Sequence, residues 1–252
     1  MTDLSGRTAV VTGGGSGLGA AIAAALHTAG ANIVVVGRDQ AKLDAVVARL
    51  GVRARSLTCD VSDPVSVDDL RARLDDTEVS ILVNNAGVPG PVAALTDISV
   101  EDWDAVFDVN VRGTFLLCKA FLPAMTARGA GDVINVASVS GKRPLANRTP
   151  YCASKMAVIG LTSTLAFEVG PAGVSVNTLS PGPVEGPRMA RNFRLEAERS
   201  GGSIADAENA FVSRAALGRM VTEDEVGRAV VAMLDMPGLC GADVDLSAGM
   251  IA

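Results

Sequence analysis

The sequence predicts an α/β fold in which helices cover both faces of a doubly wound parallel sheet. Short β-branched apolar runs alternate with longer Ala- and Leu-rich segments, as in successive βαβ units. A glycine-rich turn follows the first run directly. No linker or low-complexity tract divides the 252 residues, and 48% of them are hydrophobic, enough for a sizeable core. We therefore expect one domain over residues 1–252.

Five segments have the continuous apolar character of strands buried on both faces of a sheet. They are TAVVT (8–12), NIVVVG (32–37), VSILVNN (79–85), DVINVAS (132–138) and VSVNTLS (174–180). Residues 183–217 break this pattern, because Pro and Gly are followed by the charged stretch RMARNFRLEAERSGG. We expect this segment to leave the sheet, partly as helix, and to form a candidate substrate lid.

Composition argues against several classes of protein. The formal net charge is −6 and no block of Lys and Arg stands out, which argues against nucleic-acid binding. The four cysteines are scattered without a CxxC spacing, so neither a metal site nor a disulfide framework is expected. Apolar stretches are interrupted before about 20 residues, and the first residues lack the zones of a signal peptide. These features predict a cytoplasmic protein without a membrane partner.

The segment TGGGSGLG, residues 12–19, joins the first predicted strand to an Ala-rich helix. Glycine lets the backbone turn tightly and approach a ligand, and the free N–H groups at a helix start suit a pyrophosphate. Gly13, Gly17 and Gly19 would form this cradle. Their spacing differs from the commonest dinucleotide fingerprint, so an ordinary loop is the alternative interpretation of this segment alone.

Further motifs follow in a definite order. They are NNAG at 84–87, Asn110 in DVNVRG, Ser138, YCASK at 151–155, and Pro181–Gly182. Together with the glycine turn, this order resembles the classical short-chain dehydrogenase/reductases, including the 3-oxoacyl-carrier-protein reductases, over essentially the whole chain. The resemblance implies a single-domain Rossmann-like fold. It also implies an enzyme that interconverts a secondary alcohol and a ketone by hydride transfer with a nicotinamide cofactor.

The resemblance implies four catalytic residues, Asn110, Ser138, Tyr151 and Lys155. Hydride transfer to a carbonyl needs a positioned acid to protonate the forming alkoxide, and Tyr151 would be this proton donor or acceptor. A tyrosine in water has a pKa of about 10, and a nearby cation favours its ionised form. Lys155, one helical turn later, can bring such a cation to the same face. Ser138 would hold the substrate oxygen, and Asn110 would anchor a proton-relaying water. In isolation, a Tyr–Lys pair at this spacing is more often a surface pair.

The glycine turn and the family motifs together indicate a larger set of cofactor-binding residues. These are Gly13, Ser16, Gly17, Leu18, Gly19, Arg38, Asp60, Val61, Asn85, Ala86, Gly87, Tyr151, Lys155, Pro181, Gly182 and Val184. Asp60 would accept a hydrogen bond from the adenine amino group. The alternative for Asp60 is a helix cap or turn residue, because Asp-Val-Ser-Asp is also good turn chemistry.

The choice between NADP(H) and NAD(H) depends on VVVGRDQ, residues 34–40. An acidic residue after the second strand would bind the ribose hydroxyls of NAD, whereas the corresponding position here is Gly37, followed by Arg38. A guanidinium can pair with the 2′-phosphate of NADP, so NADP(H) is favoured. Asp39 could compete for Arg38, which leaves NAD(H) possible.

One position departs from the family pattern. Many members carry a threonine four residues after the glycine of the Pro–Gly motif, where it bonds the nicotinamide carboxamide. The residue at that spacing here is Gly186. Backbone groups near Val184, or another side chain, would then have to hold the carboxamide.

Arg148, Arg188 and Met189 are the candidate substrate-binding residues. Arginine suits carboxylate and phosphate groups, so a small anionic hydroxy or keto substrate is expected. The alternative is a solvated helix face whose arginines pair with acids such as Glu196. A 3-oxoacyl thioester substrate, or a non-catalytic dinucleotide-binding sensor or scaffold, stays open. By resemblance the protein would be a homotetramer or dimer, with ADVDLSAGMIA (242–252) near an interface.

Overall fold

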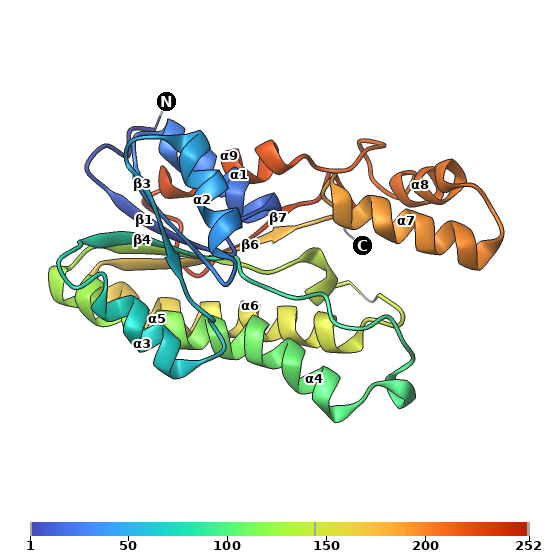
Figure 1. The fold of residues 1–252 in the computed structure, drawn as a ribbon, viewed down its shortest axis with the longest axis horizontal. Helices are drawn as coiled ribbons and strands as arrows, with labels where there is room; N and C mark the ends of the chain where they lie inside the picture. Colours follow the sequence, from blue (N-terminus) through green and yellow to red (C-terminus); the bar gives the residue numbers. More distant parts are fainter. Residues whose placement is uncertain (1, 144, 251–252) are drawn as a thin grey trace.

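The computed structural model describes residues 2–143 and 145–250, with the backbone alone for Arg188. Seven parallel strands form one sheet in the order β3-β2-β1-β4-β5-β6-β7 (Figure 1). The strands are β1 (Thr8–Thr12), β2 (Asn32–Gly37), β3 (Ala54–Thr58), β4 (Val79–Asn84), β5 (Gly131–Val136), β6 (Val174–Pro181) and β7 (Asp243–Leu246). The chain order reverses between β1 and β4, which confirms the doubly wound parallel sheet.

The five predicted strands are present to within about two residues, whereas the two edge strands, β3 and β7, were not predicted. Neither contains a continuous apolar run, because an edge strand has partners on one side only and can keep polar side chains in water. In β7 all four residues are half-buried. The segment expected near a subunit interface thus contains a strand of the sheet.

Helices cover both faces of the sheet (Figure 1). One face carries α1 (Gly17–Thr28), α2 (Gln40–Leu50) and α9 (Glu223–Leu234), and the other carries α3 (Pro64–Ala72), α4 (Val100–Phe107), α5 (Gly113–Arg128) and α6 (Thr149–Val169). Each layer encloses its own apolar core: Ile22, Leu26 and Val230 belong to the first, and Leu117 and Phe121 to the second. This arrangement leaves the carboxyl ends of the strands open for a site.

The predicted excursion consists mainly of two helices, α7 (Pro187–Ser200) and α8 (Ile204–Val212), which project away from the sheet (Figure 1). Phe193 of α7 is buried and packs edge-to-face on Phe211 of α8, with ring centroids 5.6 Å apart. A parallel bridge between Val184 and Val221 closes the base of the excursion. Its movement as a lid stays a prediction.

A buried polar chain fixes α6 against the sheet. Asn84 Nδ2 donates to Asn135 Oδ1 at 2.8 Å, and Asn135 Nδ2 donates to Thr162 Oγ1 of α6 at 2.8 Å. All three residues are buried. Breaking one such bond would leave a buried polar group unpaired, at about 1–3 kcal/mol. The chain therefore holds the position and register of α6, the helix that carries Tyr151 and Lys155.

The same helix is the one described stretch that is long and apolar enough to cross a membrane by length and composition, over Thr149–Ala172. Its inner face packs on β6 and holds the buried Lys155, so this face belongs to the interior of the protein. Its outer face leaves Phe167 86% exposed and Met156 45% exposed. Ser163 and Thr164 are exposed between these two apolar side chains, so the outer face is mixed in character.

Candidate active site

The glycine turn lies between β1 and α1, at the reversal of strand order. Gly13 (φ +64°) and Gly17 (φ +52°) adopt the left-handed conformation that favours glycine. Gly19 is required for a different reason: a Cβ there would lie 2.2 Å from the Gly13 carbonyl oxygen. Each of the three predicted glycines is therefore required at its position, two by backbone conformation and one by close packing.

The start of α1 suits an anionic ligand. Among the described residues, the first turn of α1 has no acidic side chain, and the Ser16 side chain at the N-cap makes no capping hydrogen bond. The N–H groups of a first helical turn lack intrahelical partners, and the helix dipole adds a partial positive charge. Ser16, Gly17, Leu18 and Gly19 line a cleft at this point. The residues present thus fit a dinucleotide pyrophosphate.

Thr12, at the end of β1, joins the glycine turn to the NNAG segment after β4. Its Oγ1 accepts hydrogen bonds from the backbone N–H groups of Asn85 and Ala86, both at 3.1 Å. Asn85 Nδ2 donates back to the Thr12 carbonyl at 2.9 Å. The two segments on either side of the reversal are therefore fixed to each other before any cofactor binds.

Tyr151 and Lys155 lie on one face of α6, toward the cleft. The Lys155 side chain is buried, with a residue exposure of 5%, and its Nζ donates to the Val136 carbonyl at 2.8 Å. This Nζ lies 5.8 Å from the centroid of the Tyr151 ring, and the Arg148 guanidinium carbon lies 5.7 Å from the same centroid. Two cations therefore flank the tyrosine.

Ser138 follows β5 and is buried at the same cleft. Its Oγ donates to the Pro181 carbonyl at 3.4 Å and accepts from the Ser140 N–H at 3.2 Å, at the start of the short helix η3 (Val139–Gly141). The long bond to Pro181 leaves the hydroxyl weakly held. Such a hydroxyl can exchange that partner for a substrate oxygen.

Asn110 lies in a π-helical turn, η2 (Asp108–Arg112), between α4 and α5. Its Oδ1 accepts from the Val88 N–H at 2.8 Å, and its Nδ2 donates to the Val88 carbonyl and to Ser154 Oγ, both at 3.0 Å. Both polar groups of the side chain are thus hydrogen-bonded to other residues of the protein. The predicted water relay would have to use the Asn110 backbone carbonyl, which Thr114 Oγ1 also contacts at 2.9 Å.

Most of the predicted site residues meet in one cleft of about 1580 Å³. Its lining includes Gly13, Ser16, Gly17, Leu18, Gly19, Asn85, Ala86, Gly87, Ser138, Arg148, Tyr151, Lys155, Pro181, Gly182, Val184 and Met189. Four predicted residues, Arg38, Asp60, Val61 and Asn110, are outside this lining. The side chain of Arg188 lies outside the part of the chain that the structure describes.

The segment after β2 contains Arg38 and Asp39, and the sequence left open whether these two residues pair. Asp39 caps α2 through the Lys42 N–H at 3.2 Å and pairs with Lys42 Nζ at 3.0 Å, so its carboxylate is engaged away from Arg38. Arg38 is exposed. Hydrogen bonds from Ser62 hold the pKa of the Asp60 carboxyl below its usual value, and the charge of Arg38 contributes. Asp60 therefore has the turn role that was its alternative, while adenine binding stays a prediction.

Several cleft residues were not predicted from the sequence. Phe211, Arg214 and Glu223 line the cleft, and they come from α8, from the segment just after it, and from α9. Arg199 also lines it, but both of its bonds to Glu196 make it the paired, solvated arginine that the sequence offered as an alternative. Phe211, Arg214 and Glu223 are distant in sequence from every motif. Ser154, which contacts Asn110, stands within YCASK, so that motif indicated its position.

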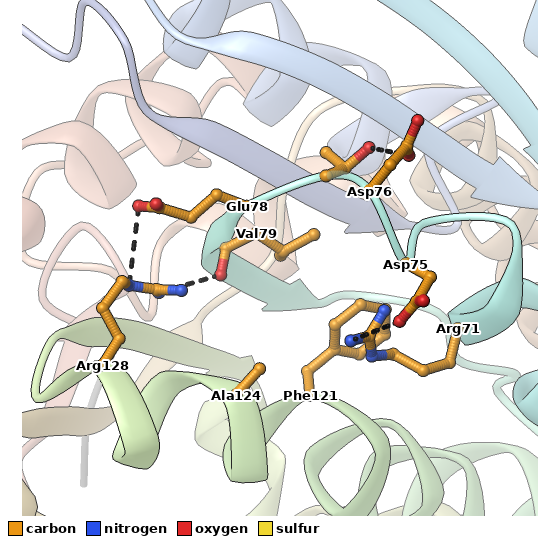
Figure 2. A pocket seen from close by; sticks show the side chains of 9 residues that line it. Arg71, Asp75, Asp76, Glu78, Val79, Phe121, Ala124 and Arg128 are labelled. Carbon is orange, nitrogen blue, oxygen red and sulfur yellow. Dashed lines mark hydrogen bonds and ion pairs between the residues drawn. The ribbon is translucent and has the colours of Figure 1, made fainter.

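A second, smaller pocket of about 260 Å³ opens at the start of β4, the opposite end of that strand from the NNAG segment. Figure 2 shows its charged side chains paired with one another: Arg71 with Asp75, and Arg128 with Glu78 and the Val79 carbonyl. These exposed pairs are typical of a solvated surface. The pocket contains none of the predicted site residues.

A glycine turn at a strand-order reversal, joined to a serine, a tyrosine and a buried lysine, defines a dinucleotide-dependent oxidoreductase. The family model described as short chain dehydrogenase matches residues 7–198, and the chain belongs to this family. It is accordingly an NAD(P)-dependent oxidoreductase that interconverts an alcohol and a ketone of a small-molecule substrate.

The similar proteins differ in the substrate that they are named for and in the cofactor that they bind. The chain is 36% identical over 234 residues to the D-beta-hydroxybutyrate dehydrogenase of Cupriavidus necator. The aligned region covers 90% of each chain. It is similar to a solved actinorhodin polyketide ketoreductase with NADPH (TM-score 0.92, 32% identity, 99% of each chain). It is also similar to an NAD⁺-bound xylitol dehydrogenase (TM-score 0.90, 29% identity, 98% of this chain and 99% of the other).

We predict that Gly19→Ala destabilises the protein by roughly 1–3 kcal/mol and weakens dinucleotide binding, because its Cβ would meet backbone that cannot move aside. Urea unfolding and cofactor titration measure the two effects. Gly238→Ala is the matched control, since a Cβ there has nothing within 4 Å and the backbone φ is not positive. Equal stability of the two variants would contradict the packing argument.

Proposed function

We propose that Tyr151 is the proton donor and acceptor of the reaction, that Ser138 binds the substrate oxygen, and that Lys155 stabilises the ionised tyrosine. The observation that supports this most strongly is the buried Lys155 ammonium beside the Tyr151 ring, held by the Val136 carbonyl. Burying an ammonium group costs free energy unless hydrogen bonds or an opposite charge stabilise it. Its charge favours the tyrosinate and so eases proton exchange with an alcohol.

The cofactor would be held by the glycine turn at its pyrophosphate and by Lys155 and the Pro181–Gly182 segment at its nicotinamide end. When bound, it supplies or accepts the hydride. Ser138 Oγ then leaves the Pro181 carbonyl and donates to the substrate oxygen, while Tyr151 delivers or removes the proton at that oxygen. Near Lys155, the Asn110 backbone carbonyl would hold the water that exchanges this proton with solvent.

The preferred cofactor is NADP(H), and Arg38 would contact its 2′-phosphate. Two observations support this preference: Asp39, the competing acid, is engaged with Lys42, and Arg38 is exposed after β2. A guanidinium binds a phosphate in bidentate fashion, which a ribose hydroxyl cannot match. NAD(H) is the alternative, as in the NAD⁺-bound xylitol dehydrogenase that this chain resembles.

The substrate class is a small anionic hydroxy or keto acid. Arg148 is half-buried at the cleft beside Tyr151, where it can receive a carboxylate while the carbonyl faces the tyrosine. The similar D-beta-hydroxybutyrate dehydrogenase is named for such an acid. The alternative within enzymes is a 3-oxoacyl thioester, favoured by the likeness to a polyketide ketoreductase. A non-catalytic sensor would not need Ser138, Tyr151 and Lys155 together.

The chain forms a homotetramer or a dimer, and it resides in the cytoplasm. The exposed apolar side chains of Phe167 and Met156 on α6 support an interface between copies. The C-terminal segment, 242–252, would lie near an interface; residues 251–252 lie outside the described part of the chain.

Tyr151→Phe should lower kcat by about 10²- to 10⁴-fold, because only the hydroxyl that transfers the proton is removed. Dinucleotide affinity should stay within about twofold. The measurement is nicotinamide absorbance across neutral ketones, keto acids and acetoacetyl thioesters. Cys152→Ala, the next residue in α6, controls for a disturbed helix. Near-normal turnover of Tyr151→Phe would refute the assigned role.

Arg38→Ala should weaken NADPH binding by roughly tenfold to a hundredfold, the range expected when a charge-assisted bond to phosphate is lost. NADH serves as the internal control because it lacks the 2′-phosphate, so its affinity should not change. Calorimetric titration of both cofactors measures the two constants. An unchanged NADPH affinity would show that Arg38 does not bind the phosphate.

Arg148→Met should raise the KM for short keto acids by roughly tenfold or more, as expected when a carboxylate loses its guanidinium partner. The KM for neutral ketones of similar size should change little. Arg191→Met is the matched control, because Arg191 is exposed and does not line the cleft. An equal loss with neutral and acidic substrates would contradict the anion site.

A further inference from the structure

Glu223, the first residue of α9, places its carboxylate between two segments of the cofactor cleft. A Cβ built on Gly17, at the start of α1, would have Glu223 Oε1 as its nearest neighbour, at 3.6 Å. A Cβ built on Gly186, just before α7, would lie 3.2 Å from the same oxygen. Glu223 is half-buried and lines the cleft together with both glycines. Glu223 lies far from the glycine turn in the sequence, so no motif associates the two.

The two neighbouring acidic residues in the same helical turn are each paired with an arginine. Asp224 is exposed and pairs with Arg228 at 2.9 Å. Glu225 completes a capping box with Thr222, and its bonds from Arg219 lower the pKa of its carboxyl to about 2. Among the described residues Glu223 has no ion-pair partner. Its carboxylate instead faces the positive end of α1 across Gly17.

A carboxylate at this place competes with a dinucleotide. In the cofactor-free protein it lies near the partial positive charge of the α1 N-terminus, a favourable position for an anion. The pyrophosphate requires the same N–H groups. Two anions in a wet cleft repel each other over several ångströms, and salt screens the repulsion.

We propose that Glu223 sets the affinity for the cofactor, and that its negative charge weakens dinucleotide binding by repelling the pyrophosphate. The inference rests on the proposed cofactor position and adds a residue that opposes binding. Because NAD(H) and NADP(H) share the pyrophosphate, the effect is equal for both. This distinguishes Glu223 from Arg38, whose effect is confined to the 2′-phosphate.

The test compares Glu223→Gln with Asp224→Asn by calorimetric titration of NADPH and NADH at low and high salt. Both variants lose one negative charge from the first turn of α9, but only Glu223 faces Gly17. Glu223→Gln should lower the Kd of both cofactors by roughly three- to tenfold at low salt and by less at high salt. Asp224→Asn should change the Kd less than twofold. Thermal unfolding of the cofactor-free variants checks that each is folded.

Two results would overturn the inference while leaving the proposed function intact. Unchanged affinity in Glu223→Gln would show that the carboxylate does not act on the pyrophosphate. Weaker binding in both Glu223→Gln and Glu223→Ala would show that it makes an attractive contact with the cofactor, in the space that Gly186 leaves open. If the wild-type protein bound neither cofactor, the proposed function would fail and this inference with it.

Discussion

The active site depends on the hydrogen bonds of one buried side chain, Asn110. With 1% of its surface exposed, it cannot exchange its protein partners for water without a large loss of free energy. It holds both polar backbone groups of Val88, in the loop after NNAG, and donates to Ser154 of α6. Ser154 in turn donates to the Tyr151 carbonyl at 2.8 Å. One amide therefore fixes the tyrosine's helix to the loop that borders the cofactor cleft.

This constraint explains why Lys155 can be buried. The Asn84–Asn135–Thr162 chain holds α6 on the sheet from the middle of the helix, and Asn110 holds it at its first turns. Between these two points the Lys155 ammonium meets the Val136 carbonyl at the end of β5. With α6 fixed, the spacing of Tyr151 and Lys155 is preset, and preset geometry is what lets a charge stabilise an ionised group without reorganisation.

Sequence could predict the parts of the molecule in which local chemistry determines structure. Buried strands between two helical layers need continuous apolar runs, so β1, β2, β4, β5 and β6 were identifiable, whereas the edge strands β3 and β7 were not. Gly13, Gly17 and Gly19 were identifiable because left-handed backbone and close contact leave few other choices. Val88 and Glu223 make contacts between segments far apart in the chain, and no local pattern encodes such contacts. Ser154 also makes such a contact, with Asn110, but its place within YCASK indicated its position.

The two halves of the cleft differ in how firmly the fold holds them. The half proposed to bind the cofactor is formed by the carboxyl ends of central strands, whose side chains are fixed by the sheet and by Thr12 and Asn110. The other half is lined by residues of α7 and α8, which project from the sheet and rest on their own Phe193–Phe211 contact. Substitutions there can alter the pocket without disturbing the sheet. If the substrate binds beside α7 and α8, as proposed, substitutions in these helices would change substrate preference and leave the chemistry at Tyr151 and Lys155 the same. The sequence therefore defines the reaction more sharply than the substrate.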